Sequence, residues 1–489
     1  MATTTEKEPR TLHVFVLTAL VVGSMIGAGI FGLPSQMARV AAPGPLILGW
    51  AWAGFGMLTL TIAFQSLALR RPDIDGGIYG YARAGFGDYI GFCSSIGYWI
   101  GAVIGNVSFL VLLMASLGTF FPIFKDGNTV PAIIGASLVL WVVHFLVWRG
   151  IHEAAGVNVV VTIAKVIPLV AFIGVALYYF NPEFLTENWW GTGLQIYPDG
   201  STKPETLGGM WSQIVAMMLI TVWVFSGVEG AGIFSKRARS RKDVGTATIA
   251  GYLFVLALLI LVNLLSYGII HQTDLSKVAD PSLAGLFAQM VGPWGAKFIA
   301  IGLSISLVGI LLSWTILCTE ILRIPAFDGV VPAKVGIANK YGTPPVALWA
   351  STLTVQALLV WTAISDNSYQ YLILLASGCI LIPYVWSALY QLKESFTDDP
   401  KAVLPATKLD KVVGVISSLY ALWLIYAGGM GYLMGSLTLY FLLTGLFVYA
   451  KKESNAPRVF AWYEWIVLAV LATVSVAFVV LSVLGIITI

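Results

Sequence analysis

The chain is organised as apolar blocks of about 20 residues, separated by short polar stretches. A helix of about 20 apolar residues crosses the roughly 30 Å hydrocarbon core of a bilayer. In lipid, only helices satisfy their own backbone hydrogen bonds over such lengths. The pattern therefore predicts an all-α polytopic membrane protein with about 13 transmembrane helices. The predicted spans cover residues 13–38, 45–69, 88–120, 131–149, 157–180, 208–235, 244–271, 295–325, 345–364, 369–392, 411–428, 430–450 and 463–487.

Composition agrees with this pattern. Of 489 residues, 58% are hydrophobic and 10% are charged, whereas a soluble domain carries about 25% charged residues. The first apolar block has no small-residue cleavage site, so we expect no cleavable signal peptide. The cysteines Cys93, Cys318 and Cys379 all lie in apolar blocks, which argues against a disulfide framework and a cysteine metal site. We expect no cofactor, no metal and no nucleic-acid partner.

Basic residues are distributed unevenly between the two sets of loops. Most of the 27 lysines and arginines fall in one set. The opposite set holds only Arg39, Lys125, Lys203, Lys277 and Lys297. Because cytoplasmic loops are enriched in Lys and Arg, we expect the N-terminus in the cytoplasm. An odd number of spans then places the C-terminus outside.

The sequence Gly-Ala-Gly-Ile-Phe occurs twice, at residues 27–31 and 230–234. The copies lie in the first and sixth predicted helices, which cross the membrane in opposite directions. Paired glycine-rich interruptions in corresponding helices indicate a transporter built from inverted repeats. At such breaks the helix unwinds and frees N–H and C=O groups for a polar ligand. The alternative is that the small residues only allow close helix packing.

Charged residues inside the predicted spans are few, and such residues often mark functional sites. Lys165 lies roughly 12 Å into the fifth helix, and Glu229 stands beside the sixth-helix break. For both, a structural hydrogen-bond or ion-pair role is the alternative. Glu320 and His144 lie near the ends of the eighth and fourth helices, where they either stay hydrated or contribute to function. An enzyme would need a catalytic group such as a carboxylate pair or a Ser/His/Asp set, and the sequence pattern contains none.

Several motifs resemble the amino acid–polyamine–organocation transporters, and in particular their basic amino acid/polyamine antiporter branch. They follow one another in order, with the helix spacing preserved over most of residues 12–450. The matching segments are Gly23–Phe31, Gly97–Trp99 with Ile104–Asn106, Val222–Gly230, Ser313–Thr315 with Asp328–Gly329, and Pro383–Tyr384. Residues Ile163–Pro168 and Arg241–Gly245, with the extra thirteenth helix, are more narrowly similar to arginine/ornithine antiporters.

The resemblance implies a LeuT-like fold of two inverted five-helix repeats, with discontinuous helices 1 and 6. The cytoplasmic N-terminal segment would be residues 1–12, and the first repeat residues 13–180. Residues 208–392 would form the second, inverted repeat. Residues 411–487 would form three peripheral transmembrane helices.

The resemblance also implies a substrate site. Its residues would be Ser24, Gly27, Ala28, Gly29, Gly101, Ala102, Asn106, Trp223, Ser226 and Trp314. Freed N–H groups at the first break suit a substrate carboxylate, and carbonyls near Trp223 and Ser226 suit its α-ammonium group. The faces of Trp223 and Trp314 would hold a cationic side chain by cation–π contact.

Asn106 and the carbonyls of Gly101 and Ala102 would add hydrogen bonds to the substrate. Ala28 and Ala102 stand where the related arginine exchanger has serine and cysteine. Gating or coupling roles are implied for Tyr98, Glu229 and Lys165.

We therefore expect an antiporter in the plasma membrane that exchanges arginine for ornithine by alternating access, either as a monomer or as a homodimer. Amino acids and the lipid bilayer would be its partners. The main alternative is a proton-coupled uptake permease for a cationic or neutral amino acid. Lys165 keeps it open, because in sodium-independent relatives a lysine on the fifth helix resembles a built-in cation that replaces sodium between helices 1 and 8. An alternative of another class is an amino-acid sensor that binds ligand without transporting it.

Overall fold

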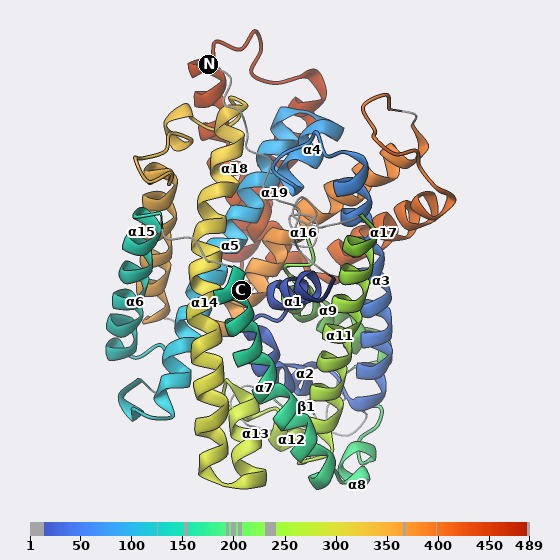
Figure 1. Cartoon of the computed structure of the whole chain (residues 1–489), viewed down its shortest axis with the longest axis vertical. Helices are drawn as coiled ribbons and strands as arrows, with labels where there is room; N and C mark the ends of the chain where they lie inside the picture. The colour runs from blue at the N-terminus through green and yellow to red at the C-terminus, as the bar shows by residue number, and fades with distance from the viewer. Residues whose placement is uncertain are drawn as a thin grey trace.

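A computed structural model describes residues 14–124, 126–150, 155–191, 195–196, 202–203, 208–229, 241–364, 368–397 and 399–486. Among these residues, eleven helices are long and apolar enough to cross a membrane. They are α3 (Pro43–Arg70), α5 (Asp88–Gly118), α6 (Val130–Trp148), α7 (Ala155–Tyr179), α11 (Arg241–Tyr267), α14 (Pro293–Phe327), α15 (Pro345–Thr362), α16 (Ser368–Phe396), α17 (Lys408–Ala427), α18 (Met430–Glu453) and α19 (Trp462–Val483). The chain is thus a helical, multi-pass membrane protein (Figure 1).

Shorter elements connect or complete these helices. The helical ones are α1 (Val14–Met25), η1 (Ala28–Phe31), α2 (Leu33–Val40), α4 (Ile78–Phe86), η2 (Pro122–Phe124), α8 (Pro182–Thr186), α9 (Met210–Phe225), α12 (Gln272–Leu275), α13 (Ser282–Val291) and η4 (Ala333–Val335). Two antiparallel strands, β1 (Gln195–Ile196) and β2 (Thr202–Lys203), pair in the loop before α9. This small ladder is the one departure from the all-α prediction among the described residues.

The first predicted span is broken in the structure. Helix α1 ends at Met25, Gly27 is extended with φ −86° and ψ −170°, and the chain resumes as η1 and then α2. At the other predicted break, α9 ends at Phe225 and Gly227 adopts a φ of +106°. The second Gly-Ala-Gly-Ile-Phe copy, residues 230–234, lies outside the described residues.

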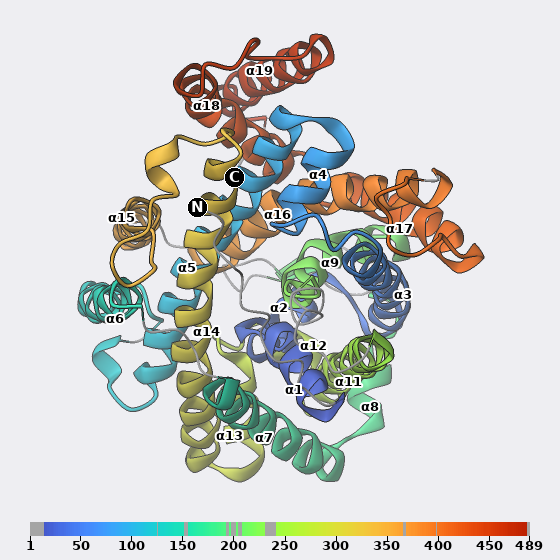
Figure 2. The same cartoon turned by 45° about the horizontal axis from the view of Figure 1, so that its top comes forward.

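Helix α5 forms the centre of the molecule. It packs along both α14 and α16, and 94% of an apolar 18-residue stretch of this helix is buried. Around it, α6 pairs with α15 on one flank and α18 pairs with α19 on another (Figure 2). Helix α19 is the opposite extreme, since 11% of its corresponding apolar stretch is buried. Such apolar exposure suits a surface that faces lipid rather than water.

The α18–α19 pair is fastened to the first turn of α5. Lys451 Nζ donates to Asp88 at 2.5 Å. Glu464 accepts the Tyr89 N–H at 2.8 Å and the Ala461 N–H at 2.7 Å. The first N–H groups of a helix have no intrahelical acceptor, so one carboxylate caps both α5 and α19.

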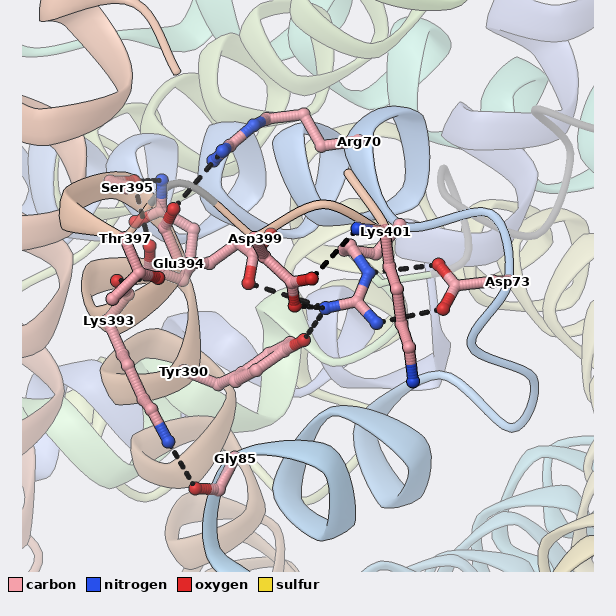
Figure 3. A network of polar contacts seen from close by, with 12 residues as sticks. Arg70, Asp73, Gly85, Tyr390, Lys393, Glu394, Ser395, Thr397, Asp399 and Lys401 are labelled. Atoms are coloured by element: carbon pink, nitrogen blue, oxygen red, sulfur yellow. Dashed lines mark hydrogen bonds and ion pairs between the residues drawn. The ribbon is translucent and has the colours of Figure 1, made fainter. Parts of the chain in front are cut away.

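Loops that the sequence assigns to one side meet in the structure. Arg71, after α3, donates to Asp73 and Asp399 at 2.8 Å each and to Tyr390 at 2.6 Å. These three partners are labelled in Figure 3. The hydrogen bond from Arg71 lowers the pKa of the Asp73 carboxyl. At the same end, Arg83 lies 2.8 Å from Asp328. These contacts support the predicted grouping of the loops.

At the opposite end, α2 is held by the segment that joins α12 and α13. Arg39 Nε donates to Ser276 O at 2.8 Å, and the Ser35 N–H donates to Ser282 Oγ at 3.3 Å. Ser35 Oγ also lies 3.5 Å from Asp280 Oδ1. Burial raises the pKa of the Asp280 carboxyl to about 6, and the positive charge of Arg39 opposes this rise. We call these contacts the α2 clasp.

Candidate functional site

The break in the first span is occupied by the ammonium group of Lys165. This side chain comes from α7, is 1% exposed, and donates to Gly23 O at 2.6 Å and to Ile26 O at 2.8 Å. The last carbonyls of a helix lack intrahelical donors and carry a partial negative charge. A buried cation therefore satisfies the end of α1. The partners of this ammonium group among the described residues are backbone carbonyls.

Beyond the break, the chain continues as η1, which begins at Ala28 directly after Gly27. No side chain caps η1 at Gly27, which leaves its first N–H groups suited to a carboxylate. Ala28 and Gly29 are buried, whereas Gly27 is half-buried. Ser24 lies in the last turn of α1, and its side chain lies outside the part of the structure that is described.

Three aromatic side chains from three helices meet beside the break. The ring centroids of Trp223 (α9) and Trp314 (α14) lie 6.1 Å apart. Phe109 (α5) lies 5.7 Å from Trp223 and 5.2 Å from Trp314, edge-on to the latter. We call these three residues the aromatic trio. The sequence analysis missed Phe109, although it follows Asn106 by one turn on the same helix.

Two glycines make room for this trio. A Cβ atom on Gly29 would lie 2.9 Å from Trp223 Cδ1. On Gly105 it would lie 3.0 Å from Trp314 Cζ3 and 3.2 Å from Trp223 Cη2. Any larger side chain at these positions would displace the indole rings. The first-helix motif and the third-helix motif therefore meet at the tryptophans.

Asn106 lies next to the trio and is 2% exposed. Its Nδ2 donates to Cys318 Sγ at 3.5 Å, while its Oδ1 has no hydrogen-bond partner among the described residues. Gly101 and Ala102 lie in the same unbroken helix, so their carbonyls could accept a substrate donor only as a second hydrogen bond. Gly101 faces α16, because a Cβ there would lie 2.6 Å from Ile380 Cγ1.

The end of α9 supplies backbone groups to the same region. The Ser226 N–H donates to Trp223 O at 3.1 Å, and Ser226 Oγ donates to Val222 O at 3.1 Å. Gly227 N donates to Glu229 Oε2 at 3.2 Å. Phe225 O accepts from the Val228 N–H at 3.2 Å. Because a carbonyl oxygen has two lone pairs, the carbonyls of this last turn can also accept from an ammonium group.

Glu229 joins three segments of the chain. Its carboxylate accepts hydrogen bonds from the hydroxyl groups of Tyr98 on α5 and Tyr384 on α16, the latter at 2.7 Å. Tyr98 and Glu229 were predicted as gating residues, whereas Tyr384 was noted only as part of a motif. The carboxylate therefore ties the end of α9 to two helices of the core.

Glu320 and His144 lie apart from these groups. Glu320 pairs with Arg323 at 3.1 Å, and its side chain is 42% exposed, which fits the hydrated alternative. His144 is fully buried against Trp349 and shares a 2.9 Å hydrogen bond with Thr352 Oγ1. In the described ranges, no group of three or more His, Cys, Asp and Glu side chains is placed to hold a metal ion.

Comparison with known proteins places this geometry in a family. The family model described as amino acid permease matches residues 12–432. An arginine/ornithine antiporter of Pseudomonas aeruginosa is 46% identical over 475 residues, covering 95% of each chain. An arginine/agmatine antiporter of Chlamydia pneumoniae is 38% identical, covering 94% of this chain and 95% of the relative.

A third relative broadens the substrates represented. An L-lysine transport protein of Corynebacterium glutamicum is 36% identical, covering 96% of this chain and 94% of the relative. These matches point to the same family as the motifs in the sequence and the broken first helix. The chain belongs to the amino acid permeases of the amino acid–polyamine–organocation superfamily.

Proposed function

We propose that this protein is a plasma-membrane antiporter that exchanges arginine for ornithine by alternating access. The observation that carries the proposal is the aromatic trio beside the broken first helix. Two indole faces can hold a cation by cation–π contact worth about 2 kcal/mol when desolvated. Relatives whose names specify arginine, ornithine, agmatine and lysine support a cationic substrate.

The two ends of an amino acid would be recognised by different groups. The substrate carboxylate would bind N–H groups at the start of η1, from Gly27 to Gly29 with Ser24 nearby. Its α-ammonium group would bind carbonyls at the end of α9, around Trp223 and Ser226. The cationic side chain would extend toward Trp314 and Asn106, and the carbonyls of Gly101 and Ala102 on α5 would be further acceptors.

The fold we propose is the LeuT-like arrangement, with residues 13–180 and 208–392 as inverted repeats and 411–487 as peripheral helices. Helices that would correspond in the two repeats pack together: α3 with α11, α5 with α14, and α6 with α15. Such pairing is what a pseudo-twofold axis through the bundle would produce. The N-terminus would lie in the cytoplasm and the C-terminus outside, in a monomer or a homodimer.

Gating would follow from the hydrogen bonds of Glu229. Its contacts with Tyr98 and Tyr384 would hold the end of α9 against α5 and α16 on one side of the site, and breaking them would open that side. Lys165 would hold the end of α1 in place while the rest of the break moves. Because arginine and ornithine each carry one positive charge, their exchange would be electroneutral.

Exchange by purified protein in liposomes tests the proposal. Labelled arginine should enter ornithine-loaded liposomes and not empty ones. The initial rate should not change when the membrane potential is clamped at different values, because no net charge moves. Strong uptake into empty liposomes under an acidic outside pH would instead establish the proton-coupled permease. Saturable binding without any flux would establish the sensor.

A further inference from the structure

Helices α5 and α14 face each other through two matched contacts. Asn106 and Phe109 lie one turn apart on α5, and Trp314 and Cys318 lie one turn apart on α14, so each pair shares a face. The Phe109 and Trp314 rings make one contact, at 5.2 Å between centroids. Asn106 Nδ2 and Cys318 Sγ make the other, at 3.5 Å.

The carboxamide of Asn106 is hydrogen-bonded through its nitrogen and not through its oxygen among the described residues. Its Nδ2 is bound to the thiol sulfur, but its Oδ1 is buried without a partner among the described residues. A buried acceptor left unpaired costs about 1–3 kcal/mol, so such atoms in native structures usually have a ligand or water as partner. A Cβ atom on the neighbouring Gly105 would lie 3.0 Å from Trp314 Cζ3 and 3.2 Å from Trp223 Cη2. The free oxygen therefore lies beside the proposed cation site.

Orientation decides whether this carboxamide helps or hinders a cation. With Nδ2 held by sulfur, the group presents an acceptor to the substrate. In the flipped orientation it would present an N–H donor to a guanidinium or ammonium group, which has only donors. The sulfur of Cys318 is a weak acceptor, but it is the partner that the buried Nδ2 has in this structure.

We propose that Cys318 is a positioning residue of the substrate site. Its sulfur holds Asn106 Nδ2, so that Asn106 Oδ1 accepts a hydrogen bond from the distal nitrogen of the bound cationic amino acid. Cys318 itself does not touch the substrate. The inference rests on the proposed function, because it takes the substrate cation to lie beside the aromatic trio.

Cys379 offers a matched control. Like Cys318, it is a fully buried thiol in the helical core, but its Sγ donates to Ser436 Oγ at 3.3 Å, away from Asn106. Both cysteines can be changed to alanine with the loss of one sulfur atom. A general packing defect would affect both variants, whereas a positioning role would affect only one.

The test measures arginine exchange by Cys318→Ala, Cys318→Ser and Cys379→Ala in ornithine-loaded liposomes. Cys318→Ala should raise the KM for arginine about ten- to hundredfold, the effect of one hydrogen bond to a charged group. Its maximal rate should stay within about threefold, since the gate is untouched. Cys318→Ser should restore most of the affinity, because a hydroxyl also accepts from Nδ2. Cys379→Ala should match the wild type.

A second measurement separates positioning from packing. In an Asn106→Asp background there is no Nδ2 to hold, so adding Cys318→Ala should change arginine binding less than about twofold. An equal loss in both backgrounds would overturn the inference. So would a wild-type KM in Cys318→Ala, or equal impairment of Cys318→Ala and Cys318→Ser. If the wild type itself exchanged no arginine for ornithine, the proposed function would fail, which is a separate outcome.

Discussion

Removing the Lys165 ammonium group distinguishes a coupling role from a structural one. Among the described residues, the group donates to Gly23 O at 2.6 Å and to Ile26 O at 2.8 Å. Lys165→Ala would leave both carbonyls without this donor at the end of α1. Lys165→Met would keep most of the apolar volume while removing the charge. We expect both variants to fold and both to lose most of their exchange activity.

The magnitude follows from the two contacts. A hydrogen bond to a charged group contributes about 1.5–3 kcal/mol, so the pair contributes about 3–6 kcal/mol to the arrangement in which α1 ends at the ammonium group. Losing about 3 kcal/mol would lower the population of that arrangement relative to alternatives by roughly 100-fold. Exchange should therefore fall by about two orders of magnitude. Lys165→Arg should rescue poorly, because a planar guanidinium does not reproduce a compact ammonium.

The assay combines thermal unfolding with arginine–ornithine exchange on the same purified samples. Lys297, an exposed lysine near the start of α14, provides the control, and Lys297→Ala should leave both properties unchanged. Near-normal exchange by Lys165→Ala would refute the coupling role. A large loss of thermal stability with normal exchange in the surviving molecules would establish a purely structural lysine.

Three further perturbations probe the trio, the gate and the clasp. Trp314→Leu should weaken arginine binding by about 1–3 kcal/mol in equilibrium binding with normal expression, because a π-face is lost but apolar bulk is kept; unchanged binding would make Trp314 a packing residue. Tyr384→Phe removes one hydrogen bond to Glu229 and should change the exchange rate more than arginine affinity; an effect on affinity alone would contradict the gating role. The pKa of Asp280 is raised to about 6 in the folded protein, so charging this carboxyl destabilises the α2 clasp as pH rises from about 4 to above 6. Melting temperature should fall over this range by about 2–4 °C and fall less in Asp280→Asn; identical pH profiles would exclude the clasp as the source.

The sequence predicted the membrane architecture because hydrophobic length is a strong signal. Apolar blocks of sufficient length identified every long helix in the described residues, and the glycine-rich motif located the first break within one or two residues. Lys165 and Glu229 were also predictable, because an ionisable residue inside an apolar block is rare and needs partners. The identity of those partners was not predictable. Two backbone carbonyls and two tyrosines become neighbours only when separate helices pack.

Phe109, Cys318 and Tyr384 show where sequence reasoning stops. Each is an uncharged residue in an apolar helix, and the chain contains 25 phenylalanines and 20 tyrosines. Nothing in the local pattern distinguishes Phe109 from a lipid-facing aromatic residue. Its place in the aromatic trio depends on how α5, α9 and α14 are rotated about their axes. That rotation is set by packing at many glycines and large side chains at once, which a single periodicity does not encode.

The cap that Glu464 places on α5 has a consequence for biogenesis. The first turn of α5 is synthesised long before residue 464. The Tyr89 N–H therefore lacks its final acceptor, Glu464, until most of the chain has been made. Until α19 inserts, the central helix carries an uncapped end, and Asp88 awaits Lys451. We therefore expect the last hairpin to act as a checkpoint in assembly. A nascent bundle without the α18–α19 hairpin would expose an incomplete α5 terminus to membrane quality-control proteases.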